Sequence, residues 1–334
     1  MKRKILKVCF IISILLVSLC ISSCKKNNPV EESFPEIVNN LTSYKLTGKL
    51  ESNFPSGTKE CNITTYYNAP NMYRVELQNP NTVETQIIIK NDNGVFVLVP
   101  SINKTFKVNS SWPSTSSYPY LLQSLSQDII SDTNMVTKKE GNNTVLELKA
   151  RLHHSDINTS QKIIFGENKM PKEVLTYDQN LNLLNRFVIN SIEQNLSLDK
   201  SLFVENESMD VLFEYFKENP MEYDRLVSYP TYYPEQTSLV EESITGDSKN
   251  RVAIMKFSGS THYTIVQKFI NCLEENVSEY VNGDIYVMGG VCAFVSENNV
   301  VFYSDGIQYQ LASNTVDTLE MIKMGDSLTN NDIK

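Results

Sequence analysis

Apolar and polar side chains alternate along the segment Tyr44-Lys45-Leu46-Thr47-Gly48-Lys49-Leu50. The segment Tyr73-Arg74-Val75-Glu76-Leu77-Gln78 repeats the same period of two. This alternation is typical of a strand with one face in a core and the other in water. The two segments therefore predict an antiparallel sheet, and the rest of the fold can be worked outward from them.

Further strands are expected on both sides of these segments, about ten in all between Tyr44 and Ile192. Two of them, Ile87–Ile89 and Val95–Val99, are continuous apolar runs, which indicates that both of their faces are covered. The intervening Asn91-Asp92-Asn93-Gly94 is typical of a hairpin turn. A sheet of this size normally curls to cover its own face.

Two amphipathic helices accompany this sheet. Ser33 can cap the first, with Pro35 just inside it, and Ser117 with Pro119 opens the second. One face of the first carries Phe34, Ile37, Val38 and Leu41, and one face of the second carries Leu121, Leu122, Leu125 and Ile129. Each stripe predicts a helix that must pack against an apolar surface.

A second, smaller unit is expected from Tyr229-Pro230-Thr231-Tyr232-Tyr233-Pro234 onward. It should contain six strands between Arg251 and Ala312, a hairpin at Asp305-Gly306, and a closing helix near Thr315. The predicted class is thus α+β, mainly antiparallel β. The expected divisions are a signal peptide at 1–23, a tether at 24–32, a main domain at 33–204, a connecting helix at 205–228 and a C-terminal α+β domain at 229–334.

The first residues have the layout of a secretory signal. Lys2, Arg3, Lys4 and Lys7 precede an apolar segment from Val8 to Leu19, which is too short to span a membrane. The following Ile21-Ser22-Ser23-Cys24 resembles the bacterial lipobox. The resemblance implies that Cys24 becomes the first mature residue and carries a palmitate-type lipid anchor. Two acyl chains suffice for stable anchoring, so the protein is expected on the extracytoplasmic face of the cell membrane.

Charge argues against nucleic acid as a partner. The 334-residue chain has a formal charge of −9, and loss of the four basic signal residues would bring it to about −13. An acidic surface repels phosphate backbones and anionic membranes. Of six cysteines, Cys61, Cys272 and Cys292 remain beside Cys24 in the mature chain. A Cys272–Cys292 bridge is one interpretation; buried thiols are the favoured one, because an odd number cannot form a complete disulfide framework.

Catalytic motifs are absent from the sequence, which has no H-E-x-x-H, G-x-S-x-G, phosphate-binding glycine loop or C-x-x-C. Adjacent residues on a strand point to opposite faces, so His153 and His154 would not bind one metal together there. In a loop they could, but nothing nearby has ligand spacing. His262 is interpreted as an ordinary half-buried histidine. We therefore expect no enzyme activity, no metal and no cofactor.

Two aromatic features have competing interpretations. Trp112 could be an exposed anchor for a partner, or could cap the core of the sheet, which is favoured. The cluster from Tyr229 to Pro234 could bind a peptide, or could pack at the entry to the second domain, which is again favoured.

Several motifs together resemble a known family. They are Tyr44-x-Leu-x-Gly-x-Leu50, Asn68-Ala-Pro-Asn-Met-Tyr-Arg-Val-Glu76, Asn93-Gly-Val-Phe-Val-Leu-Val-Pro100, Asn103-Lys-Thr-Phe106, Trp112-Pro113 and Tyr120-Leu-Leu-Gln-Ser-Leu125. This region looks like the LolA/LolB fold, in particular the LolA-like lipoproteins of spore-forming Gram-positive bacteria, including those of the GerS type. The two-part plan is also similar to the RseB/MucB regulators. The resemblance implies a curved half-barrel with helices in its concavity.

What the resemblance implies for function is a non-enzymatic, membrane-anchored binding protein in sporulation, germination or envelope maintenance. One alternative is a carrier or acceptor of lipids or lipoproteins, with an acyl-chain groove lined by Tyr44, Leu46, Val75, Phe96 and Leu125. Another is an interaction protein whose helices pack tightly over the sheet and whose partner is a peptidoglycan-processing enzyme or signalling protein. A third is a sensor that binds an anti-sigma-type membrane protein. LolA shuttles freely, whereas a protein lipidated at Cys24 is fixed to one membrane, which favours the interaction protein.

Overall fold

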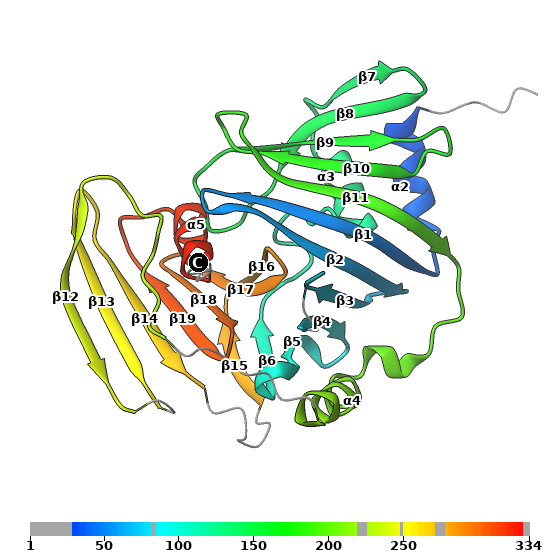
Figure 1. The fold of residues 1–334 in the computed structure, drawn as a ribbon. Coiled ribbons are helices and arrows are strands. Elements are labelled where there is room, and N and C mark those ends of the chain that lie inside the picture. The colour runs from blue at the N-terminus through cyan, green and yellow to red at the C-terminus, as the bar shows by residue number, and fades with distance from the viewer. Residues whose placement is uncertain (1–28, 82–83, 219–225, 248–249, 271–277, 330–334) are drawn as a thin grey trace, which may run out of the picture.

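The computed structural model describes residues 29–81, 84–218, 226–247, 250–270 and 278–329. They form two sheets that lie side by side, with helices over their faces (Figure 1). The first sheet has twelve strands in the order β15-β6-β5-β4-β3-β2-β1-β11-β10-β9-β8-β7. The second has seven in the order β12-β13-β14-β19-β18-β17-β16.

The first sheet consists of two antiparallel meanders, β1 to β6 and β7 to β11, which are joined by the pairing of β1 with β11. Its strands are β1 (Ser43–Phe54), β2 (Gly57–Asn68), β3 (Met72–Gln78), β4 (Thr85–Asn91), β5 (Gly94–Val99), β6 (Lys104–Asn109), β7 (Val136–Glu140), β8 (Asn143–Ala150), β9 (Thr159–Phe165), β10 (Pro171–Tyr177), β11 (Leu183–Gln194) and, at one edge, β15 (Ser278–Asn282). The expected Asn-Gly hairpin joins β4 to β5, and Gly94 there has a φ of 134°.

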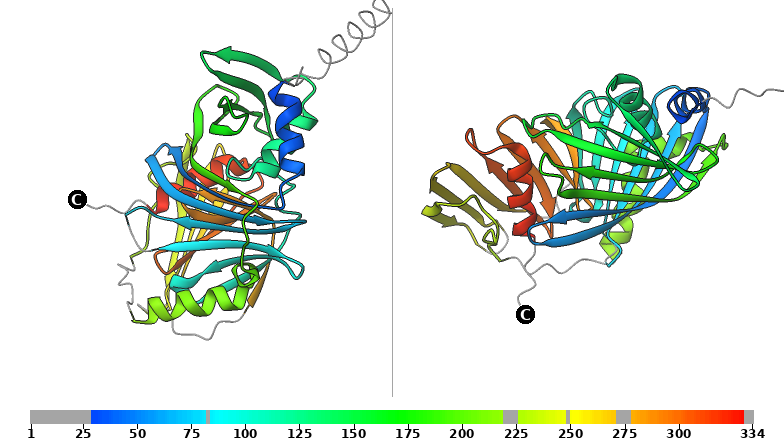
Figure 2. Two further views of the ribbon diagram at one scale, coloured as in Figure 1. Left: turned by 90° about the vertical axis from the view of Figure 1, so that its right-hand side faces the viewer. Right: turned by 90° about the horizontal axis from the view of Figure 1, so that it is seen from above.

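Two helices fill the concave side of this sheet, α2 (Val30–Asn39) and α3 (Leu122–Ser131). Figure 2 shows them lying together across the curved strands. Phe34 of α2 and Leu125 of α3 belong to the same buried cluster as Leu46 and Val75 of the sheet. The expected half-barrel with helices in its concavity is thus confirmed.

The start of α2 differs from the sequence prediction. The helix begins at Val30, with Pro29 at its N-cap, so residues 30–32 are helical and Pro35 lies inside the helix. Ser33 is in the first turn, where its Oγ donates to the Pro29 carbonyl at 2.8 Å. Val30 is buried in the core. Burial of this side chain favours the additional turn, and the pattern beginning at Phe34 did not reveal it.

The second sheet contains β12 (Thr237–Thr245), β13 (Val252–Gly259), β14 (Tyr263–Phe269), β16 (Asp284–Met288), β17 (Val291–Ser296), β18 (Asn299–Ser304) and β19 (Ile307–Ala312). The helix α5 (Thr318–Leu328) packs on it and is capped by the Asp317 carboxylate, which accepts from the Leu319 amide. The turn at Asp305-Gly306 joins β18 to β19 as expected. β12 was not among the six strands predicted.

One strand links the two sheets. β15 (Ser278–Asn282) comes from the C-terminal part of the chain but pairs in parallel with β6 at the edge of the first sheet. A further helix, α4 (Glu205–Glu218), lies on the convex face of the first sheet, where Met209 belongs to the same buried cluster as Phe96 and Leu98. Two short 3-10 turns, at Pro100–Ile102 and Lys200–Phe203, complete the described elements.

Candidate functional site

The concave face of the first sheet is a packed core. Tyr44, Leu46, Val75 and Leu125, four of the five residues predicted to line a groove, have no exposed surface. Tyr44 ties α3 to the sheet, because its hydroxyl donates to Gln123 Oε1 at 2.9 Å and accepts from the Leu122 amide at 3.3 Å. Burial raises the pKa of Tyr44 well above its usual range, so the hydroxyl stays neutral.

The fifth predicted groove residue, Phe96, lies on the opposite face. It packs with Leu98 and with Met209 of α4, whereas Val95 and Val97 face the concave core. The prediction of Phe96 as a concave residue is therefore wrong. In a strand that is apolar on both faces, alternation of polarity cannot tell one face from the other.

Aromatic rings fill the middle of the concavity. Trp112 is fully buried, edge-on to Tyr73 at 5.7 Å and 5.8 Å from Tyr118. The favoured interpretation of Trp112 as a core residue is confirmed. A chain of neighbouring rings, with centroids 5.0–6.3 Å apart, runs through Tyr44, Tyr67, Tyr73, Trp112, Tyr118, Tyr120 and Phe187.

Four of the clefts formed by described residues lie elsewhere. One of about 570 Å³ opens near Asn158 and Asp178, and another of about 440 Å³ lies beside Pro29 at the start of α2. A narrow one of about 50 Å³ lies between Tyr120 and Tyr286, where the two sheets meet. None of the five predicted groove residues lines any of the four clefts.

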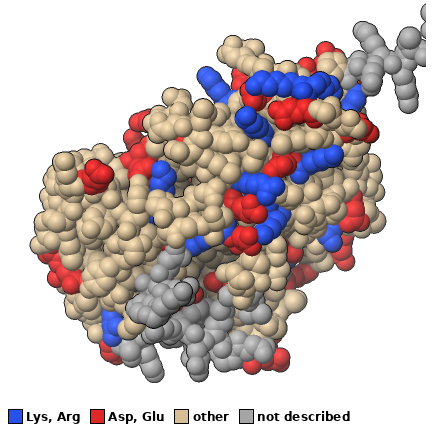
Figure 3. Space-filling view, turned by 45° about the horizontal axis from the view of Figure 1, so that its top comes forward, with Lys and Arg blue, Asp and Glu red and all other residues tan. Residues whose placement is uncertain are grey.

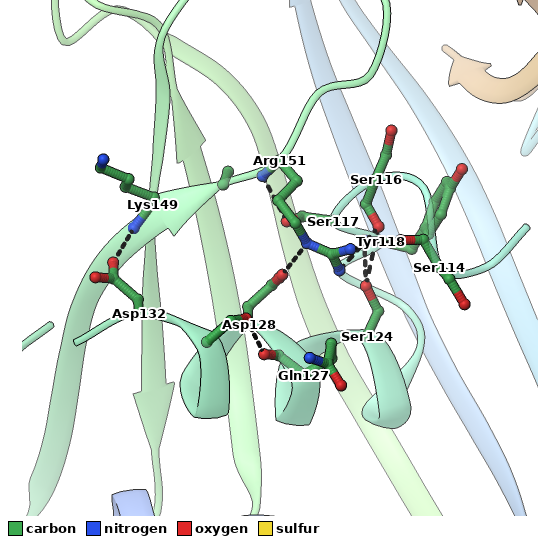
Figure 4. A network of polar contacts seen from close by, with 12 residues as sticks. Ser114, Ser116, Ser117, Tyr118, Ser124, Gln127, Asp128, Asp132, Lys149 and Arg151 are labelled. Atoms are coloured by element: carbon green, nitrogen blue, oxygen red, sulfur yellow. Dashed lines mark hydrogen bonds and ion pairs between the residues drawn. The ribbon is translucent and has the colours of Figure 1, made fainter. Parts of the chain in front are cut away.

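A buried polar network fixes the loop over α3 (Figure 4). The Arg151 guanidinium contacts Asp128 Oδ1 at 2.7 Å and donates to the Ser114 carbonyl at 2.6 Å. The Asp128 carboxylate is almost fully buried and accepts a second hydrogen bond, from Gln161 Nε2 at 2.7 Å. The network joins α3, the end of β8 and the serine-rich loop into one unit. Sequence analysis missed it because no local pattern marks these partners.

Directly after Arg151, the loop between β8 and β9 holds His153 and His154 on the same side of the chain. His154 has a φ of 62°, and the two imidazole centroids are 4.0 Å apart. Both rings reach Asp284, the first residue of β16. The strand geometry that would separate the two side chains does not apply to this loop, and the third residue comes from the other sheet.

Where the two sheets meet, the core continues from one into the other. Phe106 of β6 stacks on Tyr303 of β18 at 4.6 Å. The buried Gln86 side chain accepts from the Cys292 amide at 2.8 Å and donates to the Tyr303 carbonyl at 3.1 Å. Lys59 of β2 reaches the fully buried Asp326 of α5 at 2.7 Å.

Cys61 and Cys292 are free, buried thiols at this junction, and Cys272 lies outside the described residues. Burial raises the pKa of Cys61 to about 12 and that of Cys292 further still. The favoured interpretation as buried thiols is confirmed for these two residues.

Charged side chains of both signs are interspersed on the face seen in Figure 3. Several pair across strands of the first sheet, such as Lys138 with Glu147 at 2.6 Å and Arg186 with Glu173 at 2.6 Å. Among the described residues, no helix is long and apolar enough to cross a membrane. Cys24, the predicted lipidation site, lies outside the described residues.

Comparison with known sequences supplies the family. The sequence profile of the sporulation protein YdcC-like family matches residues 2–203. The chain belongs to this family. It is also 29% identical over 318 residues to the sporulation protein YdcC of Bacillus subtilis (strain 168), and the match covers 94% of each chain.

Solved structures with a similar arrangement have low sequence identity. MucB in complex with the periplasmic part of MucA has 9% identity and a TM-score of 0.31, covering 89% of this chain and 95% of that chain. A LolA superfamily protein from Nitrosomonas europaea has 12% identity and a TM-score of 0.32, covering 53% and 96%. A chain of the CwlD amidase–GerS lipoprotein complex from Clostridioides difficile has 14% identity and a TM-score of 0.27, covering 52% and 98%.

Proposed function

We propose that this protein is a non-enzymatic lipoprotein, anchored through Cys24 on the extracytoplasmic face of the membrane, that binds an envelope protein during sporulation. The observation that carries the proposal is the filled concavity: α2, α3 and the aromatic rings occupy the space that a lipid carrier would need for acyl chains. Membership of a sporulation protein family supports the setting. Binding is therefore assigned to the outer surface.

One part of that surface is unusually apolar. Thirteen large hydrophobic side chains are exposed among the described residues, and six belong to β12, β13 and the segment from Tyr229 to Pro234. They are Tyr229, Tyr233, Leu239, Val240, Ile244 and Ile254. Leu239 and Ile244 lie opposite Phe257 and Ala253 and share one face of the sheet, whereas Ile254, opposite Ser243, points to the other face. Tyr233 lies beside Phe257 and Tyr229 beside Glu242, so Tyr229, Tyr233, Leu239 and Ile244 are called the β12 surface below. Exposed aromatic and aliphatic side chains gathered in one place mark protein-binding surfaces.

The β12 surface also has a defined shape. β12 is the edge strand of its sheet, and its register with β13 shifts between Leu239 and Glu241, which indicates a bulge near Val240. Tyr229 donates to Glu242 at 2.5 Å, and the Tyr233 ring lies 6.4 Å from that of Phe257. A bulge and adjacent acidic side chains disfavour non-specific pairing of the β12 edge with strands of other proteins. Tyr229 and Tyr233 remain available to a specific partner.

Site-specific photo-crosslinking tests this assignment. Benzoylphenylalanine in place of Tyr233 should give a discrete crosslinked protein in sporulating cells of the native organism. The same group in place of Leu181, which is more exposed than Tyr233 but lies on the β10–β11 turn, is the matched control. The proposed surface is refuted when Leu181 gives the same product or when Tyr233 gives none while the protein is present at normal abundance.

Anchoring is tested separately. Cys24→Ala should move the protein from the membrane fraction to the soluble fraction or leave it uncleaved with its signal segment, because the lipid chains supply the proposed attachment. Detergent-free fractionation and the mass of the purified chain distinguish these products. A Cys20→Ala variant serves as control. Normal processing and membrane retention of Cys24→Ala would contradict the anchor.

A further inference from the structure

We propose that His153, His154 and Asp284 form a binding site for a divalent transition metal of the zinc type, placed between the two sheets. Each of the three residues offers one ligand atom, and these atoms lie within 4.8 Å of one another. The two histidines come from the β8–β9 loop and the aspartate from the start of β16, so the metal would bridge the parts of the fold.

The ligand atoms are already placed for coordination. His154 Nε2 lies 3.3 Å from Asp284 Oδ2, and His153 Nδ1 contacts the same oxygen. Zinc binds imidazole nitrogen and carboxylate oxygen at about 2.0–2.2 Å, so neighbouring ligand atoms in a tetrahedral site are ~3.3 Å apart. A small outward movement of the His153 ring would therefore admit the ion.

The backbone supports this arrangement. The left-handed conformation of His154 turns its side chain to the side of the chain that His153 occupies. Histidine enters this conformation more readily than most residues. The His153 amide also donates to Ser116 Oγ at 3.1 Å, which ties the loop to the network around Arg151. The backbone that carries the two imidazoles is therefore fixed by the neighbouring loop.

Asp284 is oriented by a second residue. Ser110 Oγ donates to Asp284 Oδ1 at 2.6 Å, which leaves Oδ2 directed at the imidazoles. Ser110 Oγ in turn accepts from the Trp112 amide at 3.0 Å. Hydrogen bonds of this kind to a ligating carboxylate fix its orientation in metal sites. Among the described residues, no Lys or Arg forms an ion pair with the buried Asp284.

The donor set selects the class of metal. Two imidazoles and one carboxylate suit zinc and its neighbours in the first transition row, whereas calcium and magnesium prefer oxygen donors alone. Three protein ligands leave at least one coordination position free. Because the His153 side chain is about half exposed, at 52%, that position would face solvent and could take water.

Zinc binding to the full-length protein in detergent, without a polyhistidine tag, tests the site. Equilibrium dialysis against zinc chloride, followed by elemental analysis, should show about one bound zinc per chain, because the three ligands form a single site. His154→Gln and Asp284→Asn should each weaken this binding at least tenfold, as should the half-exposed His153→Gln, which is the variant least able to disturb folding. Circular dichroism establishes that each variant is folded.

Two further variants sharpen the interpretation. His262→Gln removes the remaining histidine, which is exposed in the turn before β14, not half-buried as expected, and is not one of the three clustered residues. This variant should leave zinc binding unchanged. Ser110→Ala should weaken affinity by about 10–100-fold with the stoichiometry retained, the effect expected of a positioning residue. Absence of zinc binding in the native protein, or equal binding by native protein, His153→Gln and Asp284→Asn, would overturn the proposal.

Discussion

Arg151 illustrates at the scale of a residue how the concave core tolerates buried charge. Its partner Asp128 has a side chain only 1% exposed, and ionised groups in such surroundings require both a counter-charge and hydrogen bonds. Arg151 and Gln161 together supply them. The Arg151 guanidinium also donates hydrogen bonds to the backbone carbonyls of Ser114 and Ser116. These bonds hold the serine-rich loop in place.

Replacing Arg151 by methionine should lower the free energy of unfolding by about 2–4 kcal/mol, because Asp128 would stay buried without its counter-charge. Arg186→Met is the matched control: its side chain is 41% exposed, and loss of its surface pairs should cost below about 1 kcal/mol. Urea unfolding of both variants measures the difference. Equal losses would show that the Arg151 pair is energetically an ordinary surface contact.

Glu84 should make stability depend on pH. Burial, with a smaller contribution from the charge of Asp305, raises the pKa of its carboxyl from 4.5 to about 7 in the folded protein. The folded state therefore holds the proton more tightly than the unfolded state, and stability falls as the pH rises from below 4.5 through 7.

Glu84→Gln should remove this dependence. Relative to the native protein, the variant should gain about 1–2 kcal/mol more stability at pH 8 than at pH 5, since one pKa unit is worth about 1.4 kcal/mol and the side chain is only half-buried. Urea unfolding at both pH values measures it, with the exposed Glu297→Gln as control. A gain that is the same at both pH values would contradict the raised pKa.

At the scale of elements, α2 and α3 close the concavity. Phe34 of α2 is fully buried and meets Phe165 of β9 edge-on at 5.1 Å. Phe34→Ala should cost about 3–5 kcal/mol of unfolding free energy, the usual range for truncating a buried phenylalanine. Glu36→Ala, on the exposed side of the same helix, should cost little. Denaturant unfolding compares them, and a loss below about 1 kcal/mol at Phe34 would argue against a tightly packed helix.

Sequence alone predicted most elements whose pattern is local. The half-buried alternation of Tyr44–Leu50 gives a strand with the expected burial, and the leucines of α3 face the core. Tyr73–Gln78 also forms the expected strand, but Arg74 on its polar side is buried and donates to the Leu202 carbonyl and to Ser208 Oγ. It missed β12 and β15. Six of the nine residues in β12 and three of the five in β15 are polar or acidic, and neither strand has a buried alternation. Their pairing is decided by partners elsewhere in the chain. The face of Phe96 was likewise decided by the position of α4.

At the scale of the whole molecule, the core of the first sheet extends into the second sheet, which also has a core of its own under α5. β15 extends the first sheet, Phe106 stacks on Tyr303, and the Gln86 side chain is hydrogen-bonded to the backbone of the second sheet. Contacts of this range could not be predicted from the sequence. His153 and Asp284 are 131 positions apart, and only the folded arrangement brings them together. The candidate sites at the junction and on β12 could therefore be identified only from the structure. The prediction of Cys24 as a lipidation site rests on the sequence motif alone.

The central claim is that the half-barrel is filled by its own side chains and works as an anchored binding protein. Native mass spectrometry of the full-length lipoprotein, released gently from detergent, tests it most directly, because a covalent lipid on Cys24 survives mild activation and a bound lipid does not. The filled core predicts a single species with no dissociable lipid. A stoichiometric lipid adduct that is released on activation, and that is reduced when Leu125 is replaced by tryptophan, would contradict the account.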